Sequence, residues 1–338
     1  MADRVLVTGG SGYVAGFIIR QLINEGWDVN TTIRNLSREA EVRSNLAVDN
    51  DRVAFFQADL TGDVGWADAM AGCRHVLHVA SPFPADAPRH EDELIVPARE
   101  GVLRALRFAK QAGVERFVQT SSAAAIAYGR PRGTYTFTEA DWTNVESPDA
   151  YPYVKSKTIA ERAARDWVAV EGGAMQFASV NPSAVLGPVL SGDFSASIEL
   201  VRMLLDGAMP GCPDFGFAIV DVRDVADMHV RLLTAPDIAN ERFIAAGPFL
   251  RVVDVADILR GRLQGEARKV PTRKLPDWVV KLVALFDPRI RQVAGELGKV
   301  RNMDTSHARD KLGWEARPVA DSIVDTARSL LDQGLLKA

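Results

Sequence analysis

The first half of the chain alternates short apolar runs with longer segments in which apolar residues recur at helical spacing. Helical patterns of suitable length separate most of the apolar runs, for example at residues 102–112 and 157–170. Strands that alternate with helices form a parallel sheet covered on both faces, so we predict a doubly wound α/β fold. Its strands are expected at residues 5–7, 29–33, 53–57, 76–79, 117–120 and 177–180.

The pattern changes after about Pro182, where proline and glycine interrupt the chain and the later segments are mainly helical. Short apolar runs at residues 217–220 and 242–245 are expected to return as strands toward the sheet. An apolar stripe at residues 279–286 fits a packed helix that would roof a pocket. We therefore predict a sheet domain of residues 1–183, with the returning strands within 217–247, and a smaller, mainly helical lobe of residues 184–216 and 248–338.

Composition narrows the class of protein. The 338 residues are 47% hydrophobic and 25% charged, which excludes a disordered chain, and 40 Lys+Arg against 44 Asp+Glu argue against nucleic-acid and membrane partners. No apolar run approaches the ~18 residues of a membrane span, and residues 1–4 lead straight into a strand, which leaves no room for a signal peptide. Two cysteines allow neither a disulfide framework nor a CxxC site, so we expect a cytoplasmic protein that binds no metal.

A glycine-rich turn runs from Thr8 to Ala15 between the first strand and the first helix. Gly9 allows the tight turn, Gly12 lets a pyrophosphate approach the backbone, and Ala15 keeps the helix close to the sheet. The N-terminus of the helix presents free N–H groups to an anion. Because a strand precedes the turn and a helix follows it, the turn predicts a Rossmann-type dinucleotide-binding domain.

The residues after the second strand indicate which dinucleotide is bound. An acidic residue closing that strand would bind the ribose 2′-OH of NAD, but Asp28 opens the strand, and Arg34 closes it and is followed by Arg38. A guanidinium binds a 2′-phosphate bidentately, so we predict that the cofactor is NADP(H). Because the net charge of the chain supplies no basic field, we expect these arginines and the helix N-terminus to hold the cofactor locally. Asp59 and Leu60 follow the third strand, where Asp59 fits a contact with adenine or a simple turn equally well.

Two overlapping YxxxK patterns predict a catalytic tyrosine. Each places a phenol and an ammonium on one face of a helix: Tyr151 with Lys155, and Tyr153 with Lys157. The nearby cation is expected to lower the tyrosine pKa toward the working range of a general acid. Proline is favourable in a first helical turn and poor in an interior, so Pro152 favours the second pair.

Hydroxyl side chains end the fifth strand at Thr120, Ser121 and Ser122. This is the carboxyl edge, where open parallel sheets bind their ligands. A hydroxyl at this edge can hydrogen-bond the carbonyl of a substrate beside the tyrosine. The glycine turn, the serines and the YxxxK pattern follow one another in the order that a dinucleotide-dependent active site requires.

Together these motifs resemble the extended short-chain dehydrogenase/reductases, and more narrowly the branch that holds dihydroflavonol reductases, cinnamoyl-CoA reductases and NADPH-dependent aldehyde and ketone reductases. The resemblance covers nearly the whole chain. It rests on residues 7–15, 78–82, 120–123, 153–157, 181–188, 220–226 and 311–314.

The resemblance implies a catalytic triad of Ser122, Tyr153 and Lys157, with Ser122 preferred over Ser121 because it precedes the alanine. It also implies a set of cofactor contacts that extends from the phosphates to the nicotinamide. These are Gly9, Gly12, Tyr13 and Val14 at the turn, Arg34 and Arg38 at the 2′-phosphate, Asp59 and Leu60 at adenine, Val79, Ala80, Ser81 and Thr120 along the cleft, Tyr153 and Lys157 at the reaction centre, Pro182 and Val185 at the nicotinamide, and Ser197 at the pyrophosphate.

The chain departs from its plant relatives around the catalytic residues. Cinnamoyl-CoA reductases carry an Asn-Trp-Tyr-Cys-Tyr signature where this chain has Ala150–Tyr153, and dihydroflavonol reductases differ at residues 124–127, which are small and apolar here. We therefore expect an NADP-dependent oxidoreductase that acts on CH–OH groups and reduces an apolar or aromatic aldehyde or ketone, as a monomer or homodimer.

Two alternatives remain open at this point. A nucleotide-sugar epimerase of the same superfamily would normally retain NAD and carry an acidic residue in place of Arg34. A non-catalytic NADPH-sensing protein would usually lack the tyrosine–lysine pair that is present here.

Overall fold

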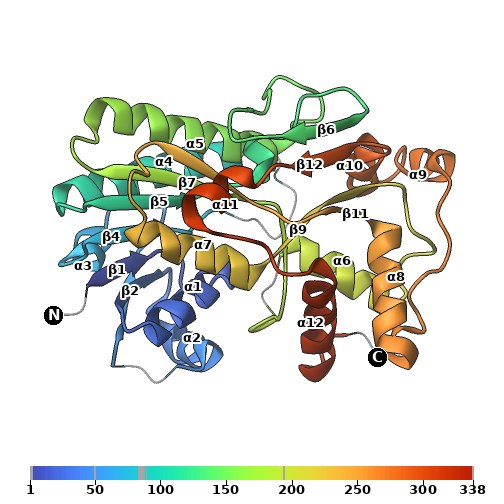
Figure 1. The fold of residues 1–338 in the computed structure, drawn as a ribbon, viewed down its shortest axis with the longest axis horizontal. Coiled ribbons are helices and arrows are strands. Elements are labelled where there is room, and N and C mark those ends of the chain that lie inside the picture. Colours follow the sequence, from blue (N-terminus) through green and yellow to red (C-terminus); the bar gives the residue numbers. More distant parts are fainter. Residues whose placement is uncertain (1–2, 49–50, 83–87, 89, 193–194, 337–338) are drawn as a thin grey trace.

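The protein is built around a seven-stranded parallel sheet (Figure 1). The computed structural model describes residues 3–48, 51–82, 88, 90–192 and 195–336. Of the residues expected to lead directly into the first strand, Met1 and Ala2 lie outside the described residues. The sheet confirms the predicted doubly wound fold. Across it the strands follow in the order β10 (Glu241–Ala245), β7 (Gln176–Pro182), β5 (Arg116–Thr120), β4 (His75–His78), β1 (Arg4–Val7), β2 (Asp28–Ile33) and β3 (Val53–Gln57).

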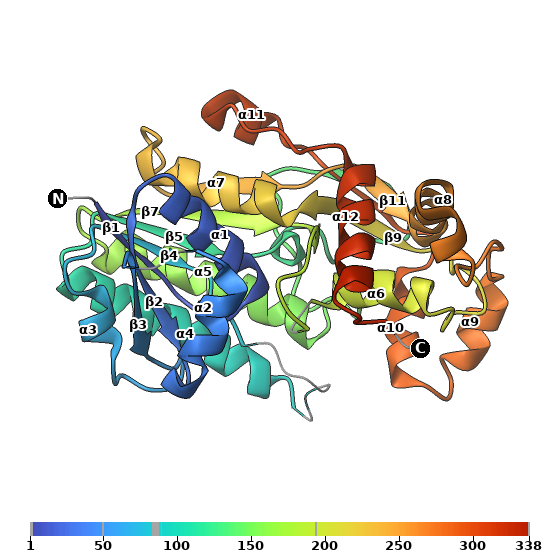
Figure 2. The same ribbon diagram turned by 90° about the horizontal axis from the view of Figure 1, so that it is seen from below.

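Helices cover both faces of this sheet, as Figure 2 shows from below. On one face α1 (Tyr13–Asn24) packs against α7 (Val222–Thr234) and α2 (Glu39–Leu46), and on the other α4 (Asp92–Gln111) packs against α5 (Pro152–Glu171) and α3 (Trp66–Met70). Fully buried β1 residues such as Leu6 form the centre of the sheet, because both faces are removed from water. Among the described residues, no helix is both long and apolar enough to cross a bilayer.

Two small sheets lie outside the main sheet and are accompanied by further helices. One is ordered β11 (Phe249–Arg251), β9 (Gly216–Asp221) and β8 (Ala184–Leu186); the other pairs β12 (Val300–Met303) with β6 (Thr134–Phe137). The helices of this part are α6 (Ala196–Leu205), α8 (Val252–Leu263), α9 (Asp277–Val283), α10 (Pro288–Glu296), α11 (Ser306–Leu312) and α12 (Val319–Asp332), and short 3-10 turns lie at η1 (Leu36–Arg38), η2 (Ala123–Ala125) and η3 (Gln264–Ala267).

The expectation that both later apolar runs return to the main sheet is half wrong. The run at 242–245 lies in β10 and pairs with β7, but the run at 217–220 lies in β9, between β8 and β11. A short apolar run shows that a strand is buried and does not show which sheet buries it. Strand β6 belongs to the first 183 residues and pairs with β12 near the other end of the chain, so the division into 1–183 and a later lobe stays a prediction.

The apolar stripe near residue 280 does not form the packed helix that was expected. Helix α9 ends at Val283, and Val280 is buried, but Leu282, Leu285 and Phe286 are 52%, 68% and 83% exposed. Periodicity predicted the helix correctly. Periodicity does not show whether another part of the protein covers the apolar face, and the described residues leave Leu282, Leu285 and Phe286 exposed.

Trp314 joins the C-terminal segment to the main domain. The indole is buried to 1% exposure, and its Nε1 donates to the carbonyl oxygen of Asp224 on α7 at 2.9 Å. The backbone N–H and the Nε of Arg317 both donate to the Asp224 carboxylate at 2.8 Å. Because α7 lies on the main sheet, these bonds fix the segment that leads to α12.

We expect Trp314→Phe to lower the free energy of unfolding by about 1–3 kcal/mol, because the buried Asp224 carbonyl loses its donor. The measurement is the denaturant midpoint. Trp278→Phe is the matched control: Trp278 is 68% exposed, and its replacement is expected to change stability by less than about 0.5 kcal/mol. Equal shifts in the two variants would contradict the role given to Trp314.

Candidate active site

The glycine turn packs so closely against its neighbours that side chains are excluded. Gly9 has φ of +75°, and a Cβ there would lie 3.1 Å from the Cα of Ala80. At Gly10, a Cβ would lie 2.2 Å from Thr31 Oγ1. Gly12 caps α1 without a side-chain hydrogen bond, and the described first turn of the helix carries no acidic residue. The helix N-terminus is thus available to an anion.

Thr8 fastens this turn to the segment after β4. Its Oγ1 accepts hydrogen bonds from the backbone N–H groups of Val79 and Ala80, both at 3.0 Å, and is bonded to His78 Nδ1 at 3.1 Å. The structure therefore brings Val79 and Ala80 beside the turn, followed by the half-buried Ser81. Sequence reasoning treated Thr8 only as the start of the turn.

The two predicted arginines lie beyond the carboxyl end of β2. Arg34 is exposed, and its charge contributes to a lowered pKa of Asp59. Arg38 donates to both carboxylate oxygens of Glu41, at 2.9 and 2.7 Å. Arg38 also lines one hollow with Gly12 of the turn, so the structure brings a guanidinium to the phosphate-binding end of α1.

Asp59 forms a turn with its own neighbour. Its Oδ1 accepts from Thr61 N at 2.8 Å and from Thr61 Oγ1 at 2.5 Å, and these bonds lower the pKa of Asp59. Leu60 packs against α4, where a Cβ at Gly101 would lie 2.9 Å from Leu60 Cδ2. Of the two roles expected for Asp59, the formation of a turn thus occupies one of its carboxylate oxygens, Oδ1. The contact with adenine stays a prediction.

The start of α5 separates the two YxxxK pairs. Tyr151 is the extended N-cap residue, and the half-buried Lys155 forms an ion pair with Glu91, with its Nζ 2.7 Å from Glu91 Oε2. Tyr153 and Lys157 are inside the helix, and Lys157 is only 8% exposed, with its Nζ 6.0 Å from the centre of the Tyr153 ring. The geometry therefore favours Tyr153 with Lys157.

The two serines after β5 face different partners. The Oγ of Ser122 accepts from Ala124 N at 3.1 Å, and the Ser122 side chain lies close enough to Tyr153 to lower the pKa of its phenol. The Oγ of Ser121 instead donates to Glu161 Oε2 at 2.5 Å. Of the two hydroxyls, it is that of Ser122 that reaches the tyrosine.

Burial governs the ionisation of the tyrosine–lysine pair. Desolvation raises the pKa of Tyr153, and its hydrogen bond with Ser122 opposes that rise. Desolvation lowers the pKa of Lys157 to about 8, opposed by the negative charge of Glu161. The expectation that the pKa of Tyr153 is lowered is therefore wrong here, because desolvation of the phenol outweighs the opposing interaction with Ser122. The phenol keeps its proton, as a proton donor must.

Other predicted contacts are used within the protein. Thr120 Oγ1 is bonded to His229 Nε2 at 2.7 Å, and Ser197 Oγ donates to the carbonyl of Val185 at 2.7 Å. Pro182 ends β7 at the carboxyl edge of the sheet. Their roles toward a cofactor stay predictions. Among the described residues, no cluster of His, Cys, Asp and Glu is suited to a metal ion.

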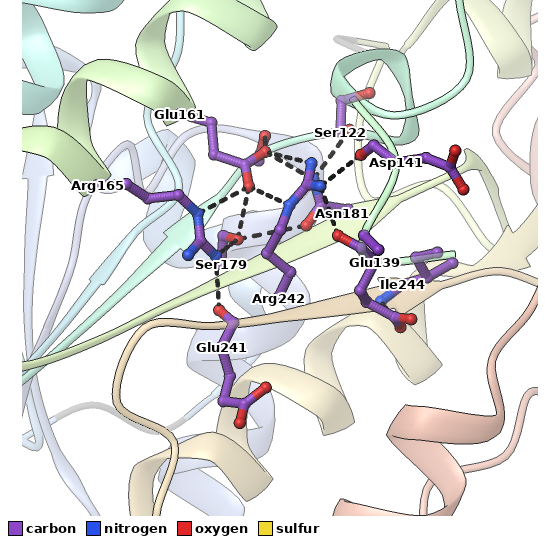
Figure 3. Close-up of polar contacts among 12 residues, drawn as sticks. Ser122, Glu139, Asp141, Glu161, Arg165, Ser179, Asn181, Glu241, Arg242 and Ile244 are labelled. Carbon is purple, nitrogen blue, oxygen red and sulfur yellow. Dashed lines mark hydrogen bonds and ion pairs between the residues drawn. The ribbon is translucent and has the colours of Figure 1, made fainter. Parts of the chain in front are cut away.

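Sequence reasoning missed a polar network behind the serines, drawn in Figure 3. Its centre is Glu161, which binds Arg242 and Asn181 and is completely buried. The available signal was a carboxylate four residues after Lys157, on the same face of a helix. Arg242 comes from β10, more than 80 residues later, and no local pattern connects the two.

Comparison with known proteins identifies the family. Residues 5–246 match the model of the NAD dependent epimerase/dehydratase family. The chain belongs to this family. Within curated relatives, it is 35% identical to a cinnamoyl-CoA reductase from Medicago truncatula, over 98% of this chain and 97% of that one. It is 31% identical to a dihydroflavonol 4-reductase from Hordeum vulgare, over 76% and 74% of the two chains.

Solved structures of the family agree over the full length. The yeast methylglyoxal/isovaleraldehyde reductase Gre2, solved with NADPH, superposes with a TM-score of 0.81 at 25% identity, covering 98% of this chain and 99% of that one. Most of the residues beyond the matched family model, after 246, are therefore also covered by this solved structure.

We expect Tyr153 to ionise above the ordinary tyrosine pKa of about 10, because burial disfavours the phenolate. The measurement is tyrosinate absorbance against pH, taken as the difference between wild type and Tyr153→Phe. Ser122→Ala removes the opposing hydrogen bond and is expected to move the titration to still higher pH. A tyrosinate signal that is complete by pH 8 would contradict this assignment.

Proposed function

We propose that this protein is an NADPH-dependent carbonyl reductase, an oxidoreductase that converts an apolar or aromatic aldehyde or ketone to the alcohol. The observation that supports the proposal is the placement of the buried Lys157 one turn after Tyr153 on α5, with its Nζ 6.0 Å from the centre of the Tyr153 ring, and of Ser122 beside the same phenol. These residues lie at the carboxyl edge of the sheet, as does the glycine turn after β1. The reductases among its relatives support this class of reaction.

The residues around the turn fit a phosphorylated dinucleotide. Gly9 and Gly10 leave no space for side chains, and the uncapped N-terminus of α1 would hold the pyrophosphate. Arg34 and Arg38 would hold the 2′-phosphate, Arg38 from the hollow that it shares with the turn. The NADPH in the yeast relative supports the same choice of cofactor.

The proposed chemistry divides between cofactor and protein. When bound, NADPH supplies the hydride that reduces the carbonyl carbon. Tyr153 donates its phenolic proton to the carbonyl oxygen, and the Ser122 hydroxyl hydrogen-bonds the same oxygen as negative charge develops on it. The Lys157 ammonium stabilises the phenolate that Tyr153 becomes. The high pKa of Tyr153 keeps the proton in place until the oxygen becomes basic enough to accept it.

Aromatic side chains beside Tyr153 support an apolar or aromatic substrate. The Tyr151 ring is stacked on Tyr153 with centroids 6.4 Å apart, and Tyr128 meets Tyr151 edge to face at 5.9 Å. Ala124 and Val154 belong to the same apolar cluster. A polar, multiply charged sugar nucleotide would find few hydrogen-bonding partners in this cluster.

The proposal is tested by following NADPH absorbance with aromatic, aliphatic and sugar-nucleotide carbonyl compounds. We expect turnover of apolar aldehydes or ketones, and a fall in kcat of about 10²–10⁴-fold in Tyr153→Phe, because the proton donor is removed. Binding of NADPH, measured by fluorescence titration, should be nearly unchanged.

Tyr151→Phe provides the matched control, since it removes a neighbouring hydroxyl and keeps the stacked ring. It should retain most of the activity. Equal losses in the two variants, or full activity of Tyr153→Phe, would refute the assignment of the proton donor. Turnover restricted to sugar nucleotides would refute the substrate class.

A separate prediction concerns the 2′-phosphate. We expect Arg34→Ala and Arg38→Ala each to raise the Kd of NADPH about 10–100-fold, the value of one charge-assisted hydrogen bond, with little change for NADH. The control is Arg99→Ala, whose side chain pairs with Glu100 on α4. If the arginine variants weaken the binding of NADH as much as that of NADPH, the two side chains do not recognise the 2′-phosphate.

A further inference from the structure

Glu161 occupies an unusual position for a charged side chain. It lies one helical turn after Lys157 on α5 and has no exposed surface. Burial raises its pKa, but Arg242 and the surrounding hydrogen bonds outweigh burial and hold the pKa of Glu161 below its ordinary value, so the carboxylate is charged. Its oxygens accept from Ser121 Oγ at 2.5 Å, Arg242 Nε at 2.7 Å, Asn181 Nδ2 at 2.8 Å, Ser179 Oγ at 2.9 Å and Arg165 Nε at 3.4 Å (Figure 3).

The carboxylate fixes the backbone that carries Ser122. Ser121 is bonded to it directly, and the Asn181 amide donates to both Glu161 Oε2 and the carbonyl oxygen of Ser122, the latter at 3.1 Å. Ser122 is thus held from β5 on one side and β7 on the other. Since Tyr153 lies two turns before Glu161 on the same helix, one side chain sets the position of the serine relative to the tyrosine.

The same carboxylate lies four residues after the buried Lys157 on α5, on the same face of the helix. Glu161 is the one charged group that raises the pKa of Lys157 against its desolvation, among the described residues. Around the pair, His78 on β4 has its pKa lowered to about 3 by burial and is neutral, and Tyr153 keeps its proton. The remaining charged groups, which face Glu161, are Arg165 on α5 and Arg242 on β10.

We propose that Glu161 is a positioning residue for the reaction proposed above: its carboxylate holds Ser122 in place against Tyr153 and supplies the negative charge that keeps Lys157 in its ammonium form. Glu161 touches neither substrate nor cofactor and acts through these three residues. The proposal rests on the proposed function for its catalytic consequence, and its electrostatic part can be tested without turnover.

The deciding variant is Glu161→Gln, which keeps the shape and removes the charge. The ammonium form of Lys157 is populated below its pKa and lost above it, so removing the negative charge should move the pKa of Lys157 down from about 8, by about one unit. The reactivity of Lys157 toward acetic anhydride, followed against pH by mass spectrometry in the protein alone, measures this pKa. The alkaline fall in kcat should move down with it.

Arg242→Lys is the matched control. It retains a cation beside Glu161 and loses the bonds that Arg242 makes to the carbonyls of Glu139 and Asp141, at 2.7 and 2.6 Å. We expect a lower melting temperature in this variant and an unchanged Lys157 titration. An equal shift in both variants, or no shift in folded Glu161→Gln, overturns the proposal.

Glu161→Asp decides the case in which Glu161→Gln does not fold. It keeps the charge and shortens the side chain, so the Lys157 titration should stay near wild type while kcat falls about tenfold or more, because Ser122 is no longer held. A wild-type kcat in this variant overturns the proposal. Failure of the proposed function gives a different result, because the wild-type protein then reduces no carbonyl compound. The titration of Lys157 needs no turnover, so it still tests the electrostatic role of Glu161.

Discussion

Glu161 is a charge with no exposed surface, and such a charge is tolerated only when hydrogen bonds and opposite charge replace the water it has lost. The fold meets this requirement with groups from α5, β5, β7 and β10. Satisfying one carboxylate therefore brings together the elements that carry Ser122, Tyr153 and Lys157. The same low-dielectric surroundings that demand this satisfaction lower the pKa of Lys157 and raise that of Tyr153.

The two ends of the candidate site rely on different physical means. At the end of the candidate site near the glycine turn, the backbone N–H groups of the α1 N-terminus, tightly packed glycines and the exposed Arg34 suit a ligand that brings its own negative charge. At the reaction end, Lys157 and Glu161 are buried, and the charge of Glu161 is matched by Arg242. Because the net charge is −4, the chain as a whole supplies no basic field that would gather an anion.

The sequence was informative wherever a feature depends on neighbours along the chain. Apolar runs indicated the strands of the main sheet, and Pro152 correctly indicated the first turn of α5, because the start of a helix is a local property. The sequence misled where partners are distant. It assigned residues 217–220 to the main sheet and a packed surface to α9, and it expected a lowered Tyr153 pKa because it counted the charge of Lys157 and not the burial around both.

By itself, then, the sequence determined the doubly wound architecture, the glycine turn and the order of the candidate catalytic residues, since periodicity and short spacings encode them. Only the tertiary structure decided that Ser121 meets Glu161, and that Glu161 meets Arg242. The reason is physical: desolvation and the pairing of buried charges depend on which distant segments exclude water from a side chain, and no local pattern records that.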